Sequence, residues 1–182
     1  MATRIQIDTS KIRGLADKLR RANNELQVGW FPGASYDSGT PVAGVAAAQE
    51  FGTKTAPARP FMRPAIAENK DKWSELYLQG AKQWLSGNLD YVSVLRGVGL
   101  QAEGDIKNQI VSGNHAPLSP ITLAIRNLKN KNVPIGKRTI GMVAAAIAEG
   151  KTGPGELGQP YGNDTPLNDT GLMIASLTHE VS

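Results

Sequence analysis

The segment at residues 53–64 constrains the fold most strongly, because it holds three prolines within eight residues. Each proline shifts the residue before it toward an extended backbone, so the segment is predicted to be an irregular but stiff connection. Residues 42–51, just before it, are small and apolar enough for a buried helix. Pro41 suits the first turn of that helix, and Gly52 suits its end.

Two long helices are predicted after this connection. The first begins at Ala65, and Gly87-Asn88 interrupts the pattern before a second helix at residues 89–112. Three glycines weaken the second helix by up to ~1 kcal/mol each relative to alanine, and close packing of another backbone would explain them. One face of this helix carries apolar or small residues at nearly heptad spacing: Val92, Leu95, Gly99, Ala102, Ile106 and Ile110.

The first thirty-one residues predict two short strands and one amphipathic helix. Residues 4–8 and 25–31 alternate apolar with polar or small side chains, as half-buried strands do. Thr9 or Ser10 would cap the helix between them, whose apolar residues recur at spacings of three and four. These residues are Ile12, Leu15, Leu19 and Ala22, and the opposite face is basic.

Three shorter helices and a strand are predicted toward the C-terminus. Ser119-Pro120 is typical of an N-cap followed by proline at the first helical position. The helix that it opens runs to about residue 129. An alanine-rich helix at 139–149, a short helix at 170–177 and a strand at 178–181 follow.

These elements together predict the α+β class, with a small mixed or antiparallel sheet packed by several α-helices. We expect one domain over residues 1–182. Near its C-terminus, residues 149–169 are rich in Gly and Pro and lack apolar periodicity. A loop of this length is uncommon as an idle connection in a compact domain.

Composition excludes several kinds of site. The chain has no cysteine, which excludes disulfides, thiol catalysis and cysteine-based metal centres. Its two histidines lie 64 residues apart, and it has no Gly-x-Ser-x-Gly motif. Residues 153–158 match the G-x-G-x-x-G fingerprint, but an alanine-rich helix precedes them and Pro160 follows. We therefore expect no enzyme, metal or cofactor.

No apolar run approaches the ~18 residues that span a membrane. The first eight residues also lack the apolar run of a secretory signal. We expect a soluble protein that folds in a reducing cytoplasm.

Charge is unevenly distributed along the chain. Residues 107–148 hold six basic and no acidic side chains, whereas residues 149–182 hold one basic and five acidic. The basic stretch could bind phosphates without sequence preference, but it has no aromatic residue for base stacking. A solvated face, a protein-facing surface and a non-specific DNA-binding module are the alternatives, and we expect protein or solvent. The candidate basic surface consists of Arg126, Lys129, Lys131, Lys137 and Arg138.

Two groups of motifs resemble those of phage proteins. Residues 45–53 (VAAAQEFGT) and 57–64 (PARPFMRP) resemble the hallmark of the tail-component and neck-protein family of long-tailed bacteriophages. Residues 117–122 (PLSPIT), with 166–172 (PLNDTGL) and Ser176, are similar to signatures of phage virion-morphogenesis and minor tail proteins. That second group includes the lambda minor tail protein Z.

The resemblance implies a structural virion subunit without catalytic residues. It implies a ring, expected to be hexameric, in the neck at the head–tail junction, where it completes tails and joins heads to them. The partners would be further copies, connector or portal-side proteins, and tail terminator or tail tube proteins. Double-stranded DNA would pass through, and no membrane is involved. A tail terminator or another minor tail protein is the alternative, since the segment 139–168 is longer than the resemblance leads us to expect.

The first candidate subunit interface lies around the proline-rich connection. Phe51 ends the preceding helix, and Arg59 and Arg63 flank the large apolar residues Phe61 and Met62. Phe61 and Met62 would either anchor the long helix to the core or form an apolar contact with an arginine rim at a subunit boundary.

The second candidate interface lies in the loop at residues 149–169. Glu156, Leu157, Tyr161 and Leu167 would belong to an arm that reaches the basic stretch of a neighbouring copy. Exposed ion pairs contribute only ~0–1 kcal/mol each, so the apolar residues would hold the arm. A surface loop without contacts is the alternative.

Overall fold

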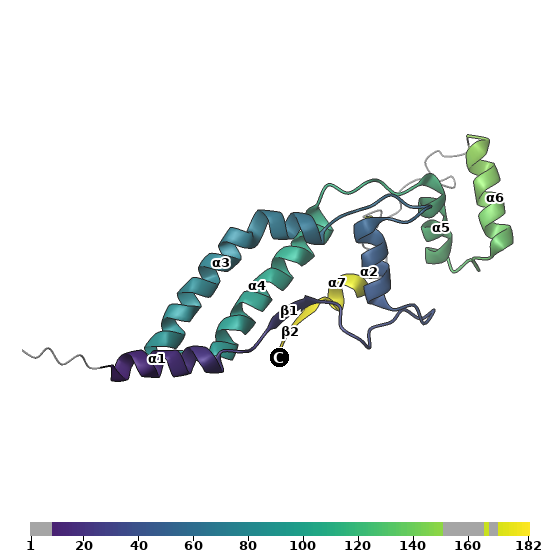
Figure 1. The fold of residues 1–182 in the computed structure, drawn as a ribbon. Coiled ribbons are helices and arrows are strands. Elements are labelled where there is room, and N and C mark those ends of the chain that lie inside the picture. The colour runs from purple at the N-terminus through teal and green to yellow at the C-terminus, as the bar shows by residue number, and fades with distance from the viewer. Residues whose placement is uncertain (1–8, 151–165, 168–170) are drawn as a thin grey trace, which may run out of the picture. The chain divides into compact units, whose positions relative to one another are not determined.

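The computed structural model describes residues 9–150, 166–167 and 171–182 (Figure 1). Among these residues it has seven helices and one antiparallel sheet of two strands, which confirms the α+β class. The predicted strand at 4–8 and most of the predicted loop at 149–169 lie outside the described residues. Within the described part, no helix combines the length and apolar character that crossing a bilayer requires.

The chain divides into two compact units. Unit 1 contains residues 1–29, 66–105 and 178–182, and unit 2 contains residues 30–65 and 106–177. The long helices α3 (Met62–Ser86) and α4 (Tyr91–Ser112) contribute residues to both. The interruption predicted at Gly87-Asn88 separates them, as expected.

Unit 1 joins the N-terminal segment, the C-terminal strand and most of the two long helices. Helix α1 (Ser10–Arg21) leads into strand β1 (Leu26–Gly29), which pairs antiparallel with strand β2 (Thr178–Val181). Leu26 lies opposite Val181 in this register. Figure 1 shows α3 and α4 side by side over much of their length.

Glycine lets the elements of unit 1 approach closely at two points. A Cβ atom at Gly80 of α3 would lie 2.6 Å from Val94 Cγ1 of α4. A Cβ atom at Gly99 of α4 would lie 2.5 Å from His179 Cδ2 and 2.8 Å from Leu26 Cδ1. The sheet therefore packs directly onto α4.

The close approach predicted for the glycines of α4 is confirmed at Gly99, although side chains make it instead of a backbone. The prediction is wrong at Gly97 and Gly104, where nothing would lie within 4 Å of a Cβ atom. Those two glycines face open space.

Asp105 ties α3 to α4 within unit 1. Its carboxylate accepts hydrogen bonds from Lys72 Nζ at 2.8 Å, Trp73 Nε1 at 2.8 Å and Gln101 Nε2 at 3.1 Å. Burial opposes its ionisation, but these three donors outweigh burial and hold the pKa of Asp105 below its usual value. Asp105 therefore holds α3 and α4 together in its ionised form.

Unit 2 is built on four shorter helices and the ends of α3 and α4. These helices are α2 (Val42–Phe51), α5 (Pro120–Asn130), α6 (Lys137–Ala148) and α7 (Leu172–Ala175). The bounds of α2 are those predicted, and α5 and α6 pack against each other (Figure 1). The largest fully buried side chains of unit 2 are Phe61, Ile106, Ile110, Leu177, Val42 and Val143.

Local signals set the end of α2 and the start of α5 as predicted, whereas Pro41, predicted in the first turn of α2, is the extended residue before it. Gly52 follows α2 with a φ of 76°, and a Cβ atom there would lie 2.8 Å from the Ala58 nitrogen. This position therefore requires glycine. At α5, Ser119 Oγ accepts a hydrogen bond from the Thr122 amide at 3.2 Å, with proline at the first helical position.

Candidate functional site

Glu50, the penultimate residue of α2, caps the N-terminus of α3. Its Oε2 accepts the backbone N–H of Phe61 at 2.7 Å and that of Met62 at 2.9 Å. Its Oε1 accepts the N–H of Arg63 at 3.2 Å. The first N–H groups of a helix lack partners inside the helix, so a carboxylate from another helix satisfies three of them at once.

The side chain of Arg63 completes this cap. Its Nε donates to Glu50 Oε1 at 2.8 Å, and its Nη2 donates to the Glu50 carbonyl oxygen at 3.0 Å. Burial opposes ionisation of Glu50, but the hydrogen bonds from Phe61, Arg63 and Met62 outweigh it and lower the pKa of Glu50. Glu50 is buried, and its negative charge is balanced by Arg63 and by the positive end of the α3 dipole.

This cap corrects the predicted start of the long helix. The sequence predicts a start at Ala65, whereas α3 begins at Met62. The helix can begin at Met62 because Glu50 accepts the N–H groups of Phe61, Met62 and Arg63. Pro64 is tolerated because it lies in the first turn, where its missing N–H is not needed.

Arg59 holds a second pair of segments together. It is buried, and its Nε donates to the Ala116 carbonyl at 2.7 Å while its Nη2 donates to the Pro117 carbonyl at 3.0 Å. Its Nη1 also reaches Gln49 Oε1 at 3.3 Å. Burial and then the charge of Arg126 lower the pKa of Arg59.

Arg59 thereby connects the two motif groups of the sequence. It belongs to residues 57–64, and the carbonyls that it binds belong to or adjoin residues 117–122. Residues 166–167 join the same unit, because Leu167 is buried and the Pro166 carbonyl lies 3.5 Å from Arg126 Nη2. Stretches that lie up to about 120 residues apart in sequence thus meet in unit 2.

The residues of the sequence motifs that meet in unit 2, around Glu50, Arg59, Phe61 and Leu167, form what we call the motif cluster. Trp30 packs on this cluster. Its ring meets the Phe61 ring edge-on, with centroids 5.6 Å apart, and its Nε1 donates to the Met173 carbonyl at 2.8 Å. A mostly apolar pocket of about 230 Å³ lies beside these rings. Phe51 and Met62 belong to its lining, together with alanines of α2.

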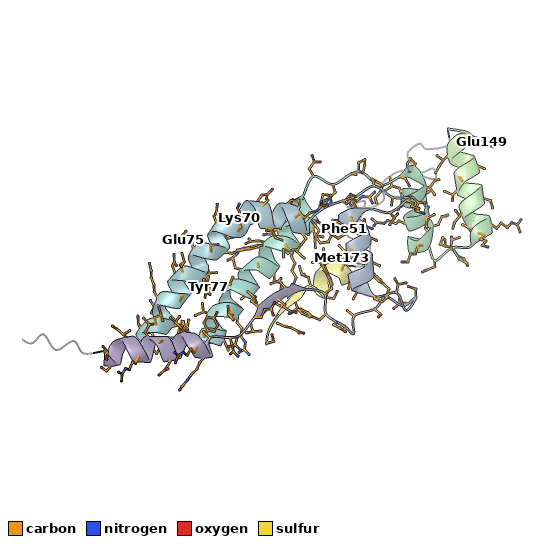
Figure 2. The ribbon with its side chains drawn as sticks, in the orientation of Figure 1. Phe51, Lys70, Glu75, Tyr77, Glu149 and Met173 are labelled. Carbon is orange, nitrogen blue, oxygen red and sulfur yellow. The ribbon has the colours of Figure 1, made fainter. Side chains whose placement is uncertain are left out.

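The structure divides the first candidate interface into buried and exposed residues. Phe61 is buried, as the core-anchor alternative predicts, and Met62 is half-buried. Phe51 is 70% exposed, and the guanidinium of Arg63 lies over its ring at 5.3 Å from the centroid. Figure 2 labels Phe51 at the end of α2. The surface of this site is therefore the Phe51–Arg63 pair at the rim of an apolar pocket.

The second candidate interface is described only at Leu167, which is buried in unit 2. Glu156, Leu157 and Tyr161 lie outside the described residues.

The candidate basic surface divides in a similar way. Lys129, Lys131, Lys137 and Arg138 are exposed. Arg126 is half-buried, close to Arg59 and to the Pro166 carbonyl, and so belongs to the motif cluster.

Sequence reasoning did not single out Glu50 as a site residue. The available signal was an acidic residue at the end of an apolar helix, where the helix dipole disfavours negative charge. Within the described residues, no group of three or more His, Asp or Glu side chains is arranged to hold a metal ion.

Comparison with known proteins returned no relative. The sequence matches no family model, and neither a curated protein nor a solved structure is significantly similar to the chain.

Proposed function

We propose that this protein is a structural virion protein of a tailed bacteriophage, forming a ring in the neck at the head–tail junction. The single observation that supports this proposal is the motif cluster of unit 2. The sequence motifs that resemble phage neck and minor tail proteins meet there, through Glu50, Arg59 and Leu167. They build one packed unit, as a shared structural signature would.

The chemistry of the cluster favours a structural role over catalysis. The charged groups of Glu50 and Arg59 are buried and spend their hydrogen bonds on backbone groups of the same chain. A catalytic group needs access to a substrate. These two side chains instead fix how α2, α3 and the segment before α5 meet.

The exposed part of the site offers a surface for subunit contact. An aromatic ring, an arginine and an apolar pocket lie together at the Phe51–Arg63 pair. Aromatic residues and arginine are enriched at protein interfaces. A tail terminator or another minor tail protein would use the same surface, and this is the alternative within the same class.

The arm that the sequence predicts at residues 149–169 is part of the same proposal. It would reach a neighbouring copy through Leu157 and Tyr161. Replacing residues 152–165 by a short Gly-Ser linker should leave a folded subunit that fails to join heads to tails, and normal yields of infectious particles would contradict this role.

Negative-stain imaging and sedimentation of the purified full chain test the ring itself. We expect closed rings with a uniform copy number of about six. A protein that stays monomeric at tens of micromolar, and is absent from the neck of assembled particles, would overturn the proposal.

The exposed basic residues motivate one test of the alternative DNA-binding function. Substituting Lys129, Lys131, Lys137 and Arg138 by glutamine should leave any DNA retention in a gel shift nearly unchanged. A salt-sensitive shift that the substitutions abolish would favour the DNA-binding module instead.

A further inference from the structure

Helix α1 carries an apolar stripe that the described residues of its own chain leave uncovered. Ile12, Leu15 and Leu19 lie on one face at spacings of three and four, as predicted, yet they are 63%, 43% and 55% exposed. The helix is strongly basic, because residues 10–21 include five Lys or Arg and one Asp.

Such a helix needs a packing partner. An isolated helix of fewer than about 12–15 residues is marginal in water, and α1 has 12 residues. Gly14 lies inside it and weakens it by roughly a further 0.8–1 kcal/mol relative to alanine. Burial of the apolar stripe is the interaction that would stabilise it.

The same unit also contains an apolar groove of about 470 Å³, which the part of the chain that the structure describes leaves open. Leu95 and Val98 of α4 are buried beneath it, and Leu26 of β1 adjoins them. Along α3 it is lined by positions 70, 73, 74, 77 and 78, which form one helical face. Figure 2 labels Lys70 and Tyr77 on this helix.

The stripe and the groove match in length. The groove extends over nine residues of α3 (70–78), about 12 Å from first to last at 1.5 Å per residue, and the stripe of α1 extends over eight residues (12–19), about 10 Å. The stripe offers three branched apolar side chains, and the groove offers Trp73, Tyr77 and Leu78 to receive them.

Charge around the groove complements that of α1. Asp71 and Glu75 are exposed on α3 one turn from the lining residues Ser74 and Leu78, and Figure 2 labels Glu75. Lys70 opposes them, whereas Lys72 is held in its ion pair with Asp105. A basic helix is therefore attracted to this side of α3.

Within one chain, α1 is held away from the groove. Lys18 Nζ donates to the Leu85 carbonyl at 3.1 Å. Leu85 is seven residues, or about 10 Å, beyond the last α3 residue of the groove. Among the described residues, this placement favours an occupant from another molecule over α1 of the same chain.

We propose that α1 of one copy docks its apolar stripe into the α3–α4 groove of a second copy. This contact rests on the proposed ring and names the surfaces that build it. Because stripe and groove are different surfaces, each copy uses both, and such a heterologous contact closes into a ring when the rotation per subunit fits.

Thiol cross-linking tests this contact directly, because the chain has no cysteine of its own. Chains carrying Leu15→Cys and differently tagged chains carrying Leu78→Cys are mixed and treated with a short bismaleimide. We expect covalent dimers that contain both tags. Leu100→Cys in place of Leu78→Cys is the matched control, since Leu100 is a similarly exposed leucine (64% against 58%) that does not line the groove.

Leucine-to-lysine substitutions at the same sites measure the energetic weight of the contact. Leu15→Lys and Leu78→Lys should each raise the dissociation constant for self-association at least tenfold, while Leu100→Lys changes it less than about twofold. Lysine keeps helix propensity, and circular dichroism with a thermal melt verifies that each variant is folded.

The outcomes separate this inference from the proposed function. Rings that persist in both variants without mixed-tag dimers would overturn the α1 contact and leave the ring intact. A further variant carries Leu15→Cys and Leu78→Cys in the same chain. Cross-links confined within single chains of this variant would also overturn the α1 contact, because α1 would then cover its own groove. A wild-type chain that is monomeric at tens of micromolar and absent from the neck of assembled particles would overturn the ring and this contact together.

Discussion

Unit 2 buries two charged side chains at its motif cluster, whereas unit 1 exposes apolar side chains along α1 and α3. In unit 2, Glu50 and Arg59 are buried and bound to backbone groups that lie 11 to 58 residues away. In unit 1, the α1 stripe and the α3–α4 groove are open at the surface. The buried charges of unit 2 have their partners within the chain, whereas the stripe and groove of unit 1 are not covered by the residues that the structure describes.

This difference separates the buried residues that carry the sequence motifs from the surface residues of the proposed α1 contact. The motif residues Glu50, Arg59, Phe61 and Leu167 are inside unit 2, so substitutions there should act mainly on folding. The α1 contact that we propose uses residues outside every motif. The motifs therefore contain Phe51 and Arg63 but none of the residues of the proposed α1 contact.

The largest effect on this comparison is expected from Glu50→Gln. The substitution removes the charge that Arg63 and three amides face, and it turns an acceptor into a group that also donates. Breaking a buried charged cap of this kind should lower the free energy of unfolding by about 2–4 kcal/mol. Chemical denaturation measures it, with Glu68→Gln, an exposed position of α3, expected within about 0.5 kcal/mol of wild type.

The pH dependence of the same pair of proteins sharpens this result. The folded pKa of Glu50 lies below its ordinary value of 4.5, so its stabilisation is complete above that value and is lost as the pH falls through the folded pKa. The stability gap between wild type and Glu50→Gln should therefore be constant near neutral pH and narrow in acid. Asp105 also has a lowered pKa, but it contributes equally to both proteins. A gap that widens in acid would contradict the capping role.

Arg59→Lys is expected to have the next largest effect, about 1–3 kcal/mol. A lysine has one ammonium in place of the planar fork that reaches the Ala116 and Pro117 carbonyls, so at least one carbonyl loses its donor. Arg96→Lys, at an exposed position of α4 in unit 1, is the control. Equal melting temperatures for the two variants would show that the Arg59 clamp is unimportant.

Two glycine substitutions compare packed and open positions within unit 1. Gly80→Ala should destabilise by about 1 kcal/mol, because its Cβ atom would lie 2.6 Å from Val94 Cγ1 and overpacking outweighs the gain in helix propensity. Gly97→Ala should stabilise by roughly 0.5–1 kcal/mol, since its Cβ atom meets nothing within 4 Å. The same sign for both substitutions would mean that the contact between α3 and α4 is looser than the Gly80–Val94 distance indicates.

The sequence predicts those parts of the fold that depend on neighbouring residues. Gly52 ends α2 and Ser119 caps α5 as expected, because a left-handed glycine and an N-cap serine act within one turn of the chain. The alternation at residues 25–31 likewise gives strand β1 within a few residues, and the strand predicted at 178–181 has the bounds of β2. The α+β class follows from these local signals.

The candidate site depends on contacts across the sequence, which spacing alone does not reveal. Glu50 caps a helix that begins 12 residues later, and Arg59 binds carbonyls more than 55 residues away. The stripe of α1 was predictable from its spacing, but its exposure was not, because burial depends on which other elements come near. The sequence therefore indicated the motif residues and left their partners undetermined.

Among these substitutions, Phe51→Ala is expected to change the free energy of unfolding least. Its effect on ring assembly should be large by comparison. The ring is 70% exposed and contacts Arg63 through a cation–π interaction, which contributes about 0.5–1 kcal/mol at an exposed site. Leu100→Ala is the matched control, because Leu100 is a comparably exposed apolar residue of unit 1. We expect both variants to unfold within about 1 kcal/mol of wild type, with only Phe51→Ala reducing the fraction of protein in rings. Equal ring yields would assign Phe51 to the chain's own cap, and the contrast between a closed unit 2 and an open unit 1 would then be complete.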